Sequence, residues 1–328
     1  MSQKLYIIDG HSQIYRAYFA VRDPASLTGY RDLTSPTGEP TRATYVFCSM
    51  LLKFIAQFRP AYLAMALDGP AEKLRRRQVY PAYKVTRRPT PEDFPPQAAR
   101  IRQIVEAMGI PVLEQEGYEA DDILATAAQR FAGPEMQVVL VSRDKDLDQL
   151  VGPHVVLYDP MKDQTLDAAA IEAEKGYPPL KAVEVQVLTG DDTDNVPGVP
   201  GIGPKTAAKL ISQYGSVEEV VAHAAELSPM LRENLLRNAG NLPLVRSLLT
   251  LDRSVPMDLR LETMRVGPRP QHQCRSPRDH RRDVLGRRRS AGQGGQQEAR
   301  QNRHRPRMVS QHQWFRLSRP AHQSARLT

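Results

Sequence analysis

Three apolar runs along the chain each end in an aspartate. They are LYIID (Leu5 to Asp9), YLAMALD (Tyr62 to Asp68) and VVLVSRD (Val138 to Asp144). Short, continuous apolar runs of this kind predict strands that are buried on both faces. Between them, Arg42 to Phe58 and Gln97 to Gly109 carry apolar residues at helical spacing, and a glycine closes the second segment. Alternating strands and helices predict an α/β fold with a largely parallel central sheet flanked by helices.

The hydrophobic pattern becomes helical from Glu184 onward. Segments such as TAAKLISQYG and SVEEVVAHAAEL repeat apolar residues every three or four positions. We therefore predict that residues 1–177 form the α/β domain and that residues 178–266 form a second, all-helical lobe.

Residues 267–328 have a different composition from the rest of the chain. They contain 15 arginines, no lysine, three acidic residues and 13 apolar residues, too few for a core. We predict a disordered basic tail, for which two interpretations remain open. It is either a basic arm that binds DNA or the out-of-frame translation of a GC-rich gene. The abruptness of the change favours the second.

The tail changes the meaning of the net charge. The whole chain carries +8 and residues 267–328 carry +12, so residues 1–266 carry −4. Affinity of the body for a polyanion must therefore come from local basic clusters and metal ions rather than from overall charge.

The cysteines and the apolar runs indicate the compartment. Cys48 and Cys274 are far apart and have no CxxC spacing, which argues against a disulfide framework and a cysteine-based zinc site. The amino-terminal apolar run is too short for a signal peptide, and no segment approaches the roughly 20 apolar residues of a membrane span. We expect a soluble, cytoplasmic protein.

Acidic residues gather at strand ends and at the starts of helices. Asp9, Asp68 and Asp144 end the predicted strands, and in parallel sheets ligands bind beyond the carboxyl ends of the strands. The segments GYEADD and TGDDTDN add further carboxylates. The nine candidate metal ligands are Asp9, Asp68, Glu119, Asp121, Asp122, Asp144, Asp146, Asp191 and Asp194.

This donor set predicts a particular chemistry. One or two carboxylates at a helix start are explained by the helix dipole alone, whereas nine are not. Oxygen donors without cysteine or histidine select Mg²⁺ or Mn²⁺ over zinc. Two such ions stabilise both the attacking and the leaving oxygen of a phosphodiester displacement.

Two other segments predict contacts with nucleic acid. GVPGIGPKTAAKLI (Gly198 to Ile211) indicates a helix-hairpin-helix whose backbone amides hold phosphates without reading bases; an ordinary helical hairpin is the alternative. Lys73 to Pro96 interleaves basic residues with Tyr80 and Tyr83, which is typical of a mobile arch that grips single strands. A solvated run of charges is the alternative there.

Several motifs together resemble a known family. The order IIDG, LDG, YPAYKVTR, GYEADD, SRDKD and TGDDTDNVPGVPGIGPKTA resembles the 5′ nuclease family found at the amino terminus of bacterial DNA polymerase I, relatives of the flap endonucleases. The resemblance covers about residues 3–265. It implies a PIN/flap-endonuclease-like fold and a monomer that uses two Mg²⁺ or Mn²⁺ ions, with K⁺ at the hairpin.

The resemblance also implies substrates. They are DNA with 5′ ends, 5′ flaps, nicks or gaps, and RNA primers, in replication and repair at the nucleoid. Polymerase activity is not expected, because the chain ends in the basic tail where the family continues toward a polymerase.

The resemblance assigns roles to residues. It implies that Asp9, Asp68, Glu119 and Asp121 hold the first ion, and that Asp122, Asp144, Asp146, Asp191 and Asp194 surround the second. It implies that Lys84 and Arg87 contact the scissile phosphate as catalytic residues. The implied DNA-binding residues are Arg16, Arg76, the base-stacking Tyr83, Gly198, Gly201, Gly203, Lys205 and Thr206. The basic stretch LRRRQ and the extra Asp192 depart from the family pattern without removing a ligand.

Two alternatives belong to other classes. A related metal-dependent ribonuclease shares the acidic edge but does not need the hairpin. A non-catalytic DNA-binding module keeps the hairpin and the arch but tolerates missing carboxylates, and none of the expected carboxylates is missing here.

Overall fold

The computed structural model describes residues 2–20 and 33–267. The prediction of a disordered tail over residues 267–328 falls, except for Gly267, outside the described residues. None of the helices in the described ranges is long and apolar enough to cross a membrane.

A six-stranded sheet in the order β3-β2-β1-β4-β5-β6 forms the centre of the α/β region. Its strands are β1 (Gln3–Asp9), β2 (Tyr62–Ala66), β3 (Val112–Leu113), β4 (Met136–Val141), β5 (Val155–Asp159) and β6 (Gln164–Leu166). Strands β1 to β5 pair in parallel, and β6 runs antiparallel to β5. The prediction of a largely parallel sheet is confirmed. Two of the predicted strands are shorter than expected, so Asp68 and Asp144 lie in the loops just after β2 and β4.

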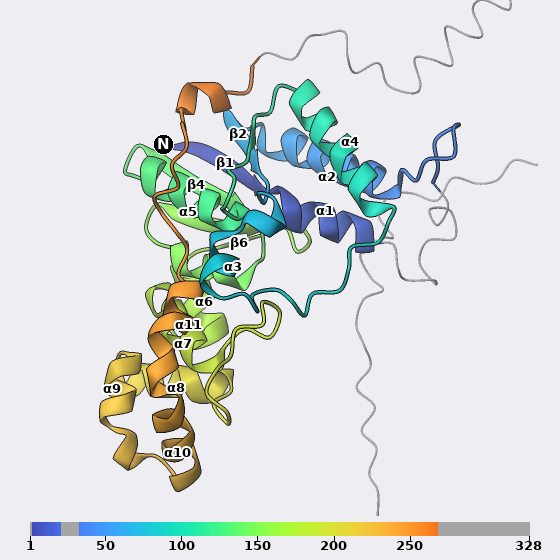
Figure 1. Cartoon of the computed structure of the whole chain (residues 1–328). Coiled ribbons are helices and arrows are strands. Elements are labelled where there is room, and N and C mark those ends of the chain that lie inside the picture. The colour runs from blue at the N-terminus through green and yellow to red at the C-terminus, as the bar shows by residue number, and fades with distance from the viewer. Residues whose placement is uncertain (1, 21–32, 268–328) are drawn as a thin grey trace, which may run out of the picture. The chain divides into compact units, whose positions relative to one another are not determined.

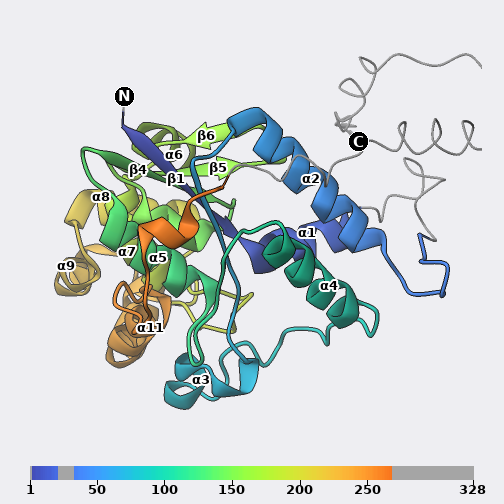
Figure 2. The same cartoon turned by 90° about the horizontal axis from the view of Figure 1, so that it is seen from above.

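Both faces of the sheet are buried, which explains the continuous apolar runs. In β1, Leu5 and Ile7 pack on the side of α5 (Ala120–Phe131), whereas Tyr6 and Ile8 pack on the opposite side. That opposite side is covered by α1 (Gly10–Phe19), α2 (Arg42–Phe58) and α4 (Phe94–Ala107). Figure 2 shows these three helices on one side of β1 and β4, with α5 on the other.

The chain passes from β1 into α1 without a loop. Asp9 caps α1, because its carboxylate accepts a hydrogen bond from the amide of Ser12 at 3.0 Å. Gly10 follows at a close crossing, where an added Cβ would lie 2.6 Å from Met65 Cγ and 2.8 Å from Ala66 O. The packing of β1 against β2 therefore fixes where α1 begins.

The basic segment after β2 contains short helices and turns. It includes the 3₁₀ helix η1 (Ala71–Lys73) and α3 (Arg75–Val79), and turns connect α3 to α4. Helix α4 begins at Phe94, three residues before the start predicted from Gln97.

Helices α7 to α11 gather into a second group with its own core (Figure 1). Its α-helices are α7 (Ala182–Thr189), α8 (Pro204–Tyr214), α9 (Val217–Ala222), α10 (Pro229–Asn238) and α11 (Leu242–Leu249). The remaining short elements of the described residues are α6 (Ala168–Lys175), η2 (Lys145–Leu150), η3 (Pro179–Lys181), η4 (Ala224–Glu226), η5 (Ala239–Asn241) and η6 (Leu261–Met264). Of these, η2, α6 and η6 contribute residues to the core of the sheet.

After α11 the chain returns to the α/β region. Residues 251–266 form a strap, extended apart from η6, and Leu251, Leu259 and Met264 are buried in the core on the α5 side of the sheet. The amide of Val266 donates to Ala61 O at 2.9 Å, just before β2. The strap therefore completes the α/β core, although the helical pattern precedes it in sequence.

Candidate active site

A pocket of about 1080 Å³ lies where the carboxyl ends of β1, β2 and β4 meet α1 and the segment after α3. The strand-end residues Asp9, Asp68 and Asp144 line it, as do Glu119 and Asp121. Parallel strands deliver these residues to one edge because their carboxyl ends all point the same way. The structure thus brings together the acidic residues that the sequence places at strand ends.

Asp9 is the most deeply buried of the strand-end carboxylates, with 3% of its surface exposed. It accepts hydrogen bonds from the amide of Ser12 and, at 2.7 Å, from the hydroxyl of Ser142. Burial, with smaller contributions from Asp144 and Asp68, raises the pKa of Asp9 to about 7. A negative charge at this position is costly unless a cation offsets it.

Asp121 lies at the start of α5 among the same carboxylates. Burial raises the pKa of Asp121 well above its usual value, and the neighbouring charges of Asp9 and Asp144 raise it further. Asp68 accepts a hydrogen bond from the amide of Ala120 at 2.8 Å, which fixes its carboxylate against the start of α5.

A second acidic group lies between η2 and the loop after α7. Carboxylate oxygens of Asp146, Asp191 and Asp194 all lie within 4.8 Å of one another. Burial, followed by the charges of Asp144 and Asp191, raises the pKa of Asp146 to about 7. Lys145 approaches Asp191 at 3.0 Å. Buried, mutually repelling oxygen donors of this kind suit a hard divalent cation.

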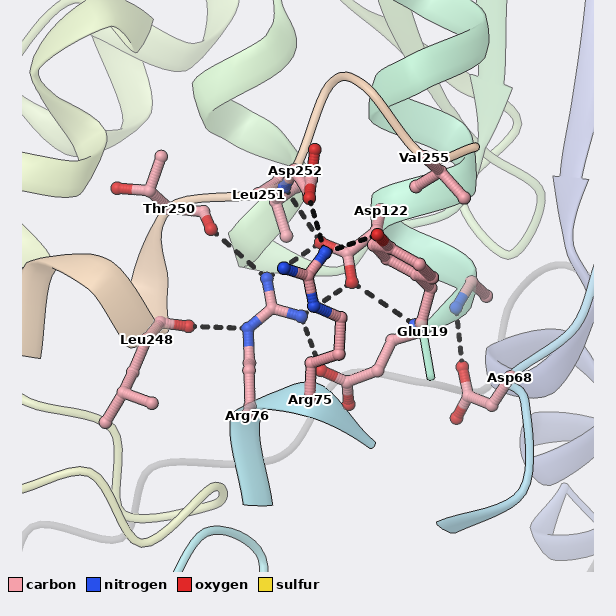
Figure 3. A network of polar contacts seen from close by, with 12 residues as sticks. Asp68, Arg75, Arg76, Glu119, Asp122, Leu248, Thr250, Leu251, Asp252 and Val255 are labelled. Atoms are coloured by element: carbon pink, nitrogen blue, oxygen red, sulfur yellow. Dashed lines mark hydrogen bonds and ion pairs between the residues drawn. The ribbon is translucent and has the colours of Figure 1, made fainter. Parts of the chain in front are cut away.

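Asp122 shares a hydrogen-bond network with Arg76 and Glu119, away from the strand-end carboxylates. Its two carboxylate oxygens accept hydrogen bonds from the Arg76 guanidinium at 2.6 and 2.7 Å (Figure 3). They also accept from the amides of Glu119 at 3.2 Å and Asp252 at 2.9 Å. Four donors occupy a side chain that is 1% exposed. The metal-ligand assignment of Asp122 does not fit this geometry, because its oxygens face Arg76 and backbone amides and, unlike Glu119, it is not among the residues that line the pocket.

Lys84 and Arg87 line the pocket and face its carboxylates. The Lys84 ammonium bonds to Glu119 and lies 3.4 Å from Asp194. Arg87 donates to Asp194 at 2.6 Å. These two residues bring positive charge to the acidic edge, and their contact with the scissile phosphate stays a prediction.

The base-stacking role predicted for Tyr83 does not fit its position. The side chain is 3% exposed, so its ring faces are covered. Its phenol lies 2.8 Å from the Asp194 carboxylate and 3.0 Å from that of Glu119. Tyr83 therefore connects the two acidic groups rather than presenting a platform to a base.

The two predicted phosphate-contacting arginines differ in their surroundings. Arg16 lines the pocket, is about one-third exposed and lies 3.6 Å from Asp159. Arg76 is largely buried and fully engaged by protein acceptors. Only Arg16 keeps a geometry compatible with the predicted contact.

The glycines of the predicted hairpin have distinct roles. An added Cβ at Gly198 would lie 2.2 Å from the backbone of Thr189, so Gly198 serves close packing. Gly201 has φ +85°, which favours glycine. Gly203 is exposed, with open space where a Cβ would lie, and it precedes α8 without a side-chain cap. Exposed Lys205 and half-buried Thr206 follow in the first turn of α8.

Besides Ser12 and Ser142, which hold Asp9, two other residues that contact the site or its surrounding loops were not identified from the sequence. Gln186 on α7 donates to Asp146 at 2.5 Å. The Asn195 side chain donates to Ala82 O at 2.7 Å and its backbone has φ 57°. The dipeptide Asp-Asn in TGDDTDN is a usable signal for Asn195, because asparagine tolerates the left-handed region. No pattern distinguishes Gln186 from other residues on its helix.

Two protein-family models match consecutive parts of the chain. Residues 4–176 match the 5′-3′ exonuclease N-terminal resolvase-like domain, and residues 177–272 match the 5′-3′ exonuclease C-terminal SAM fold. The chain belongs to the 5′-3′ exonuclease family. This confirms the resemblance seen in the sequence motifs.

Relatives of this exonuclease-family chain include whole polymerases and a separate exonuclease. It is 40% identical over 272 residues to DNA polymerase I of Rhizobium leguminosarum, covering 80% of this chain and 26% of the relative. It is 36% identical over 262 residues to the 5′-3′ exonuclease of Aquifex aeolicus, covering 80% of this chain and 86% of the relative. The chain thus spans about a quarter of the length of the first of these relatives.

Solved structures share the fold. The T5 5′-exonuclease with bound zinc ions matches with a TM-score of 0.63 at 19% identity, covering 77% of this chain and 91% of the other. A complex of the T5 D15 flap endonuclease with DNA and metal ions matches with a TM-score of 0.60 at 18% identity, covering 76% and 89%. The predicted α/β fold of the flap-endonuclease type is confirmed.

Proposed function

We propose that this chain hydrolyses phosphodiester bonds near the 5′ ends of DNA and at 5′ flaps, using two divalent ions. One observation carries the proposal: carboxylates from three strand ends and from α5 converge on a single pocket together with Lys84 and Arg87. Family membership supports the reaction class, and the pocket supports the residues that perform it.

The proposed ions are Mg²⁺ or Mn²⁺. Asp9, Asp68, Glu119 and Asp121 would hold one ion, and Asp144, Asp146, Asp191 and Asp194 would surround the other. Asp122 is left out because it does not line the pocket and its oxygens accept from Arg76 and backbone amides. When bound, the ions supply positive charge beside the reacting phosphate and stabilise both the attacking and the leaving oxygen.

The basic residues of the pocket would act on the scissile phosphate. The Lys84 ammonium and the Arg87 guanidinium lie on the pocket wall beside Glu119 and Asp194. In that position they orient a phosphate and offset the negative charge that develops during the displacement. Arg16, on the α1 side of the same pocket, would hold a neighbouring phosphate.

The helical lobe would hold the duplex. The uncapped start of α8, with Gly203, Lys205 and Thr206 near its surface, offers amides and a positive charge to a phosphate. Gly201 would shape the preceding turn, and K⁺ is the proposed ion at this hairpin. We propose that residues 1–177 carry out cleavage and that the helices within residues 178–266 bind the duplex, while the strap of residues 251–266 packs on the α/β core.

The proposed biological setting follows from the substrate. Flaps, nicks, gaps and RNA primers arise in DNA replication and repair, so we place the chain, as a monomer, in the cytoplasm at the nucleoid. A panel of 5′-labelled substrates tests the assignment: flap DNA, nicked duplex and an RNA oligomer, each with Mg²⁺ or EDTA. Mg²⁺-dependent products from the flap and nicked DNA are expected. Cleavage of the RNA oligomer in preference to both would instead support a ribonuclease.

A further inference from the structure

Arg76 links three elements that are far apart in the sequence. It belongs to α3, and its guanidinium is inserted between the start of α5 and the end of α11 (Figure 3). The side chain is 13% exposed.

Every N–H donor of this guanidinium has an acceptor. Nε donates to Leu248 O at 2.8 Å, and one terminal nitrogen donates to Glu119 at 2.8 Å and to Asp122 at 2.6 Å. The other terminal nitrogen donates to Asp122 at 2.7 Å and to Thr250 O at 3.1 Å. A guanidinium has five N–H donors, and these five bonds use all of them. No donor remains for a phosphate.

The acceptors of Arg76 lie at the ends of two different helices. Glu119 and Asp122 form the capping box at the start of α5, which binds their side chains to each other's backbone. Leu248 O and Thr250 O lie at the carboxyl-terminal end of α11, where the helix dipole favours a cation. Arg76 therefore connects the capped start of one helix to the open end of another.

Glu119 is the acceptor that reaches the pocket. Its Oε2 receives Arg76 and lies within hydrogen-bond distance of the Tyr83 phenol, while its Oε1 receives Lys84. The orientation of this carboxylate is therefore set on one side by Arg76. Without Arg76, Asp122 is left as a buried carboxylate that keeps only backbone donors.

We propose that Arg76 is a positioning residue: it fixes Glu119 toward the divalent-ion site and ties that carboxylate to the end of α11, without contacting DNA. The ion-related part rests on the proposed function. The consequence is that Arg76 forms a buried link between the helical lobe and the acidic pocket, so a change at either end alters the geometry of the other.

Two variants separate positioning from phosphate contact. Arg76→Lys keeps the charge but loses the fork that holds Asp122 and Glu119 together. Arg76→Met removes the charge, and combining it with Asp122→Asn avoids leaving a buried unpaired carboxylate if the single variant does not fold. Arg75→Lys is the matched control, because Arg75 is its exposed neighbour on α3 and lies 3.6 Å from Asp252.

The measurements use the full chain. Mn²⁺ affinity is followed by the electron paramagnetic resonance signal of free Mn²⁺, and flap-DNA affinity is measured in Ca²⁺ over a range of salt concentrations. We expect Arg76→Lys and the double variant to bind Mn²⁺ at least about tenfold more weakly, as for other partners of metal ligands. The slope of log affinity against log salt should stay unchanged, and Arg75→Lys should match wild type in both measurements.

Other outcomes overturn the proposal. Unchanged Mn²⁺ affinity with a salt slope reduced by about one in the double variant makes Arg76 a phosphate contact. A loss of folding stability with wild-type Mn²⁺ affinity reduces Arg76 to a purely structural role. Wild-type cleavage of flap DNA is measured alongside: its absence contradicts the proposed function, whereas an active wild type with unaltered variants contradicts only the role of Arg76.

Discussion

The phenol of Tyr83 lies 2.8 Å from the carboxylate of Asp194, a residue 111 positions away in the sequence. The backbone strengthens this connection, since the amide of Lys84 donates to Asp194 O at 2.9 Å. Burial, followed by the charges of Glu119 and Asp194, raises the pKa of Tyr83, so the phenol stays protonated and donates. The basic segment after α3 is thus anchored to the loop that supplies Asp191 and Asp194.

Tyr83→Phe tests this anchor. Phenylalanine keeps the ring but removes the donor, and hydrogen bonds to charged groups contribute about 1.5–3 kcal/mol. We expect the free energy of unfolding to fall by about that amount and kcat on flap DNA to fall, while affinity for a single-stranded 5′ tail is unchanged. A base-stacking Tyr83 predicts the opposite pattern: wild-type stability and kcat, because phenylalanine also stacks.

Asp121→Asn tests the repulsion among the pocket carboxylates. Flap cleavage should fall below detection, while the metal-free variant should melt at a higher temperature than wild type at pH 8. The pKa of Asp121 is raised in the folded protein, so the folded state binds more protons than the unfolded state and wild-type stability falls as pH rises through that pKa. The advantage of asparagine should therefore shrink at pH 5. Thermal melts in EDTA at both pH values, with Glu135→Gln at an exposed position as control, measure this. An asparagine variant that melts lower than wild type at pH 8 contradicts the repulsion argument.

Substitutions at Gly198 and Gly203 provide a matched comparison within the hairpin. Gly198→Ala forces a Cβ to within 2.2 Å of Thr189 and 2.5 Å of the Gly190 amide, so it should destabilise the lobe. Gly203→Val meets open space at a φ of −85° and should fold normally. It should nevertheless weaken duplex binding about equally for unrelated sequences, because backbone amides hold phosphates rather than bases. Urea unfolding and binding to two duplexes of different sequence check both. Strongly sequence-dependent loss would show that this turn does not grip the sugar-phosphate backbone.

Two truncated chains test the contributions of the strap and of the tail separately. A chain ended after Gly267 keeps Val255, Leu259 and Met264, and should cleave flap DNA at the rate of the full chain at physiological salt. A chain ended after Thr250 loses four buried apolar residues of the strap, including Leu251. Each contributes about 1.5–3 kcal/mol, so the loss is comparable to the whole stability of a domain. A chain ended after Gly267 that turned over at least about tenfold more slowly, at salt that screens non-specific contacts, would contradict the out-of-frame interpretation of the tail.

The sheet and its acidic edge could be predicted from local patterns in the sequence. Runs such as LYIID combine a buried strand with a terminal aspartate, and parallel pairing then brings Asp9, Asp68 and Asp144 to one edge. These features depend on the spacing of apolar residues and on the position of the aspartates, and both can be read from a single sequence.

Other features depend on partners that are remote in sequence. Asp122 and Asp121 are adjacent, yet the turn of α5 directs one toward Arg76 and the other among the pocket carboxylates. The basic neighbours of Tyr83 in the sequence predict a stacking residue, whereas in the structure its phenol donates a hydrogen bond to the remote Asp194. The return of the strap to Tyr62 is likewise invisible in the helical pattern that precedes it.

The central claim is that the acidic pocket cleaves DNA at 5′ flaps with divalent ions. The most direct measurement incubates the purified full chain with 5′-labelled flap DNA in Mg²⁺ or in EDTA, with Asp121→Asn as the matched variant. The account predicts short labelled products that form only in Mg²⁺ and only with the wild-type chain. Equal cleavage in EDTA, or wild-type cleavage by Asp121→Asn, would contradict it.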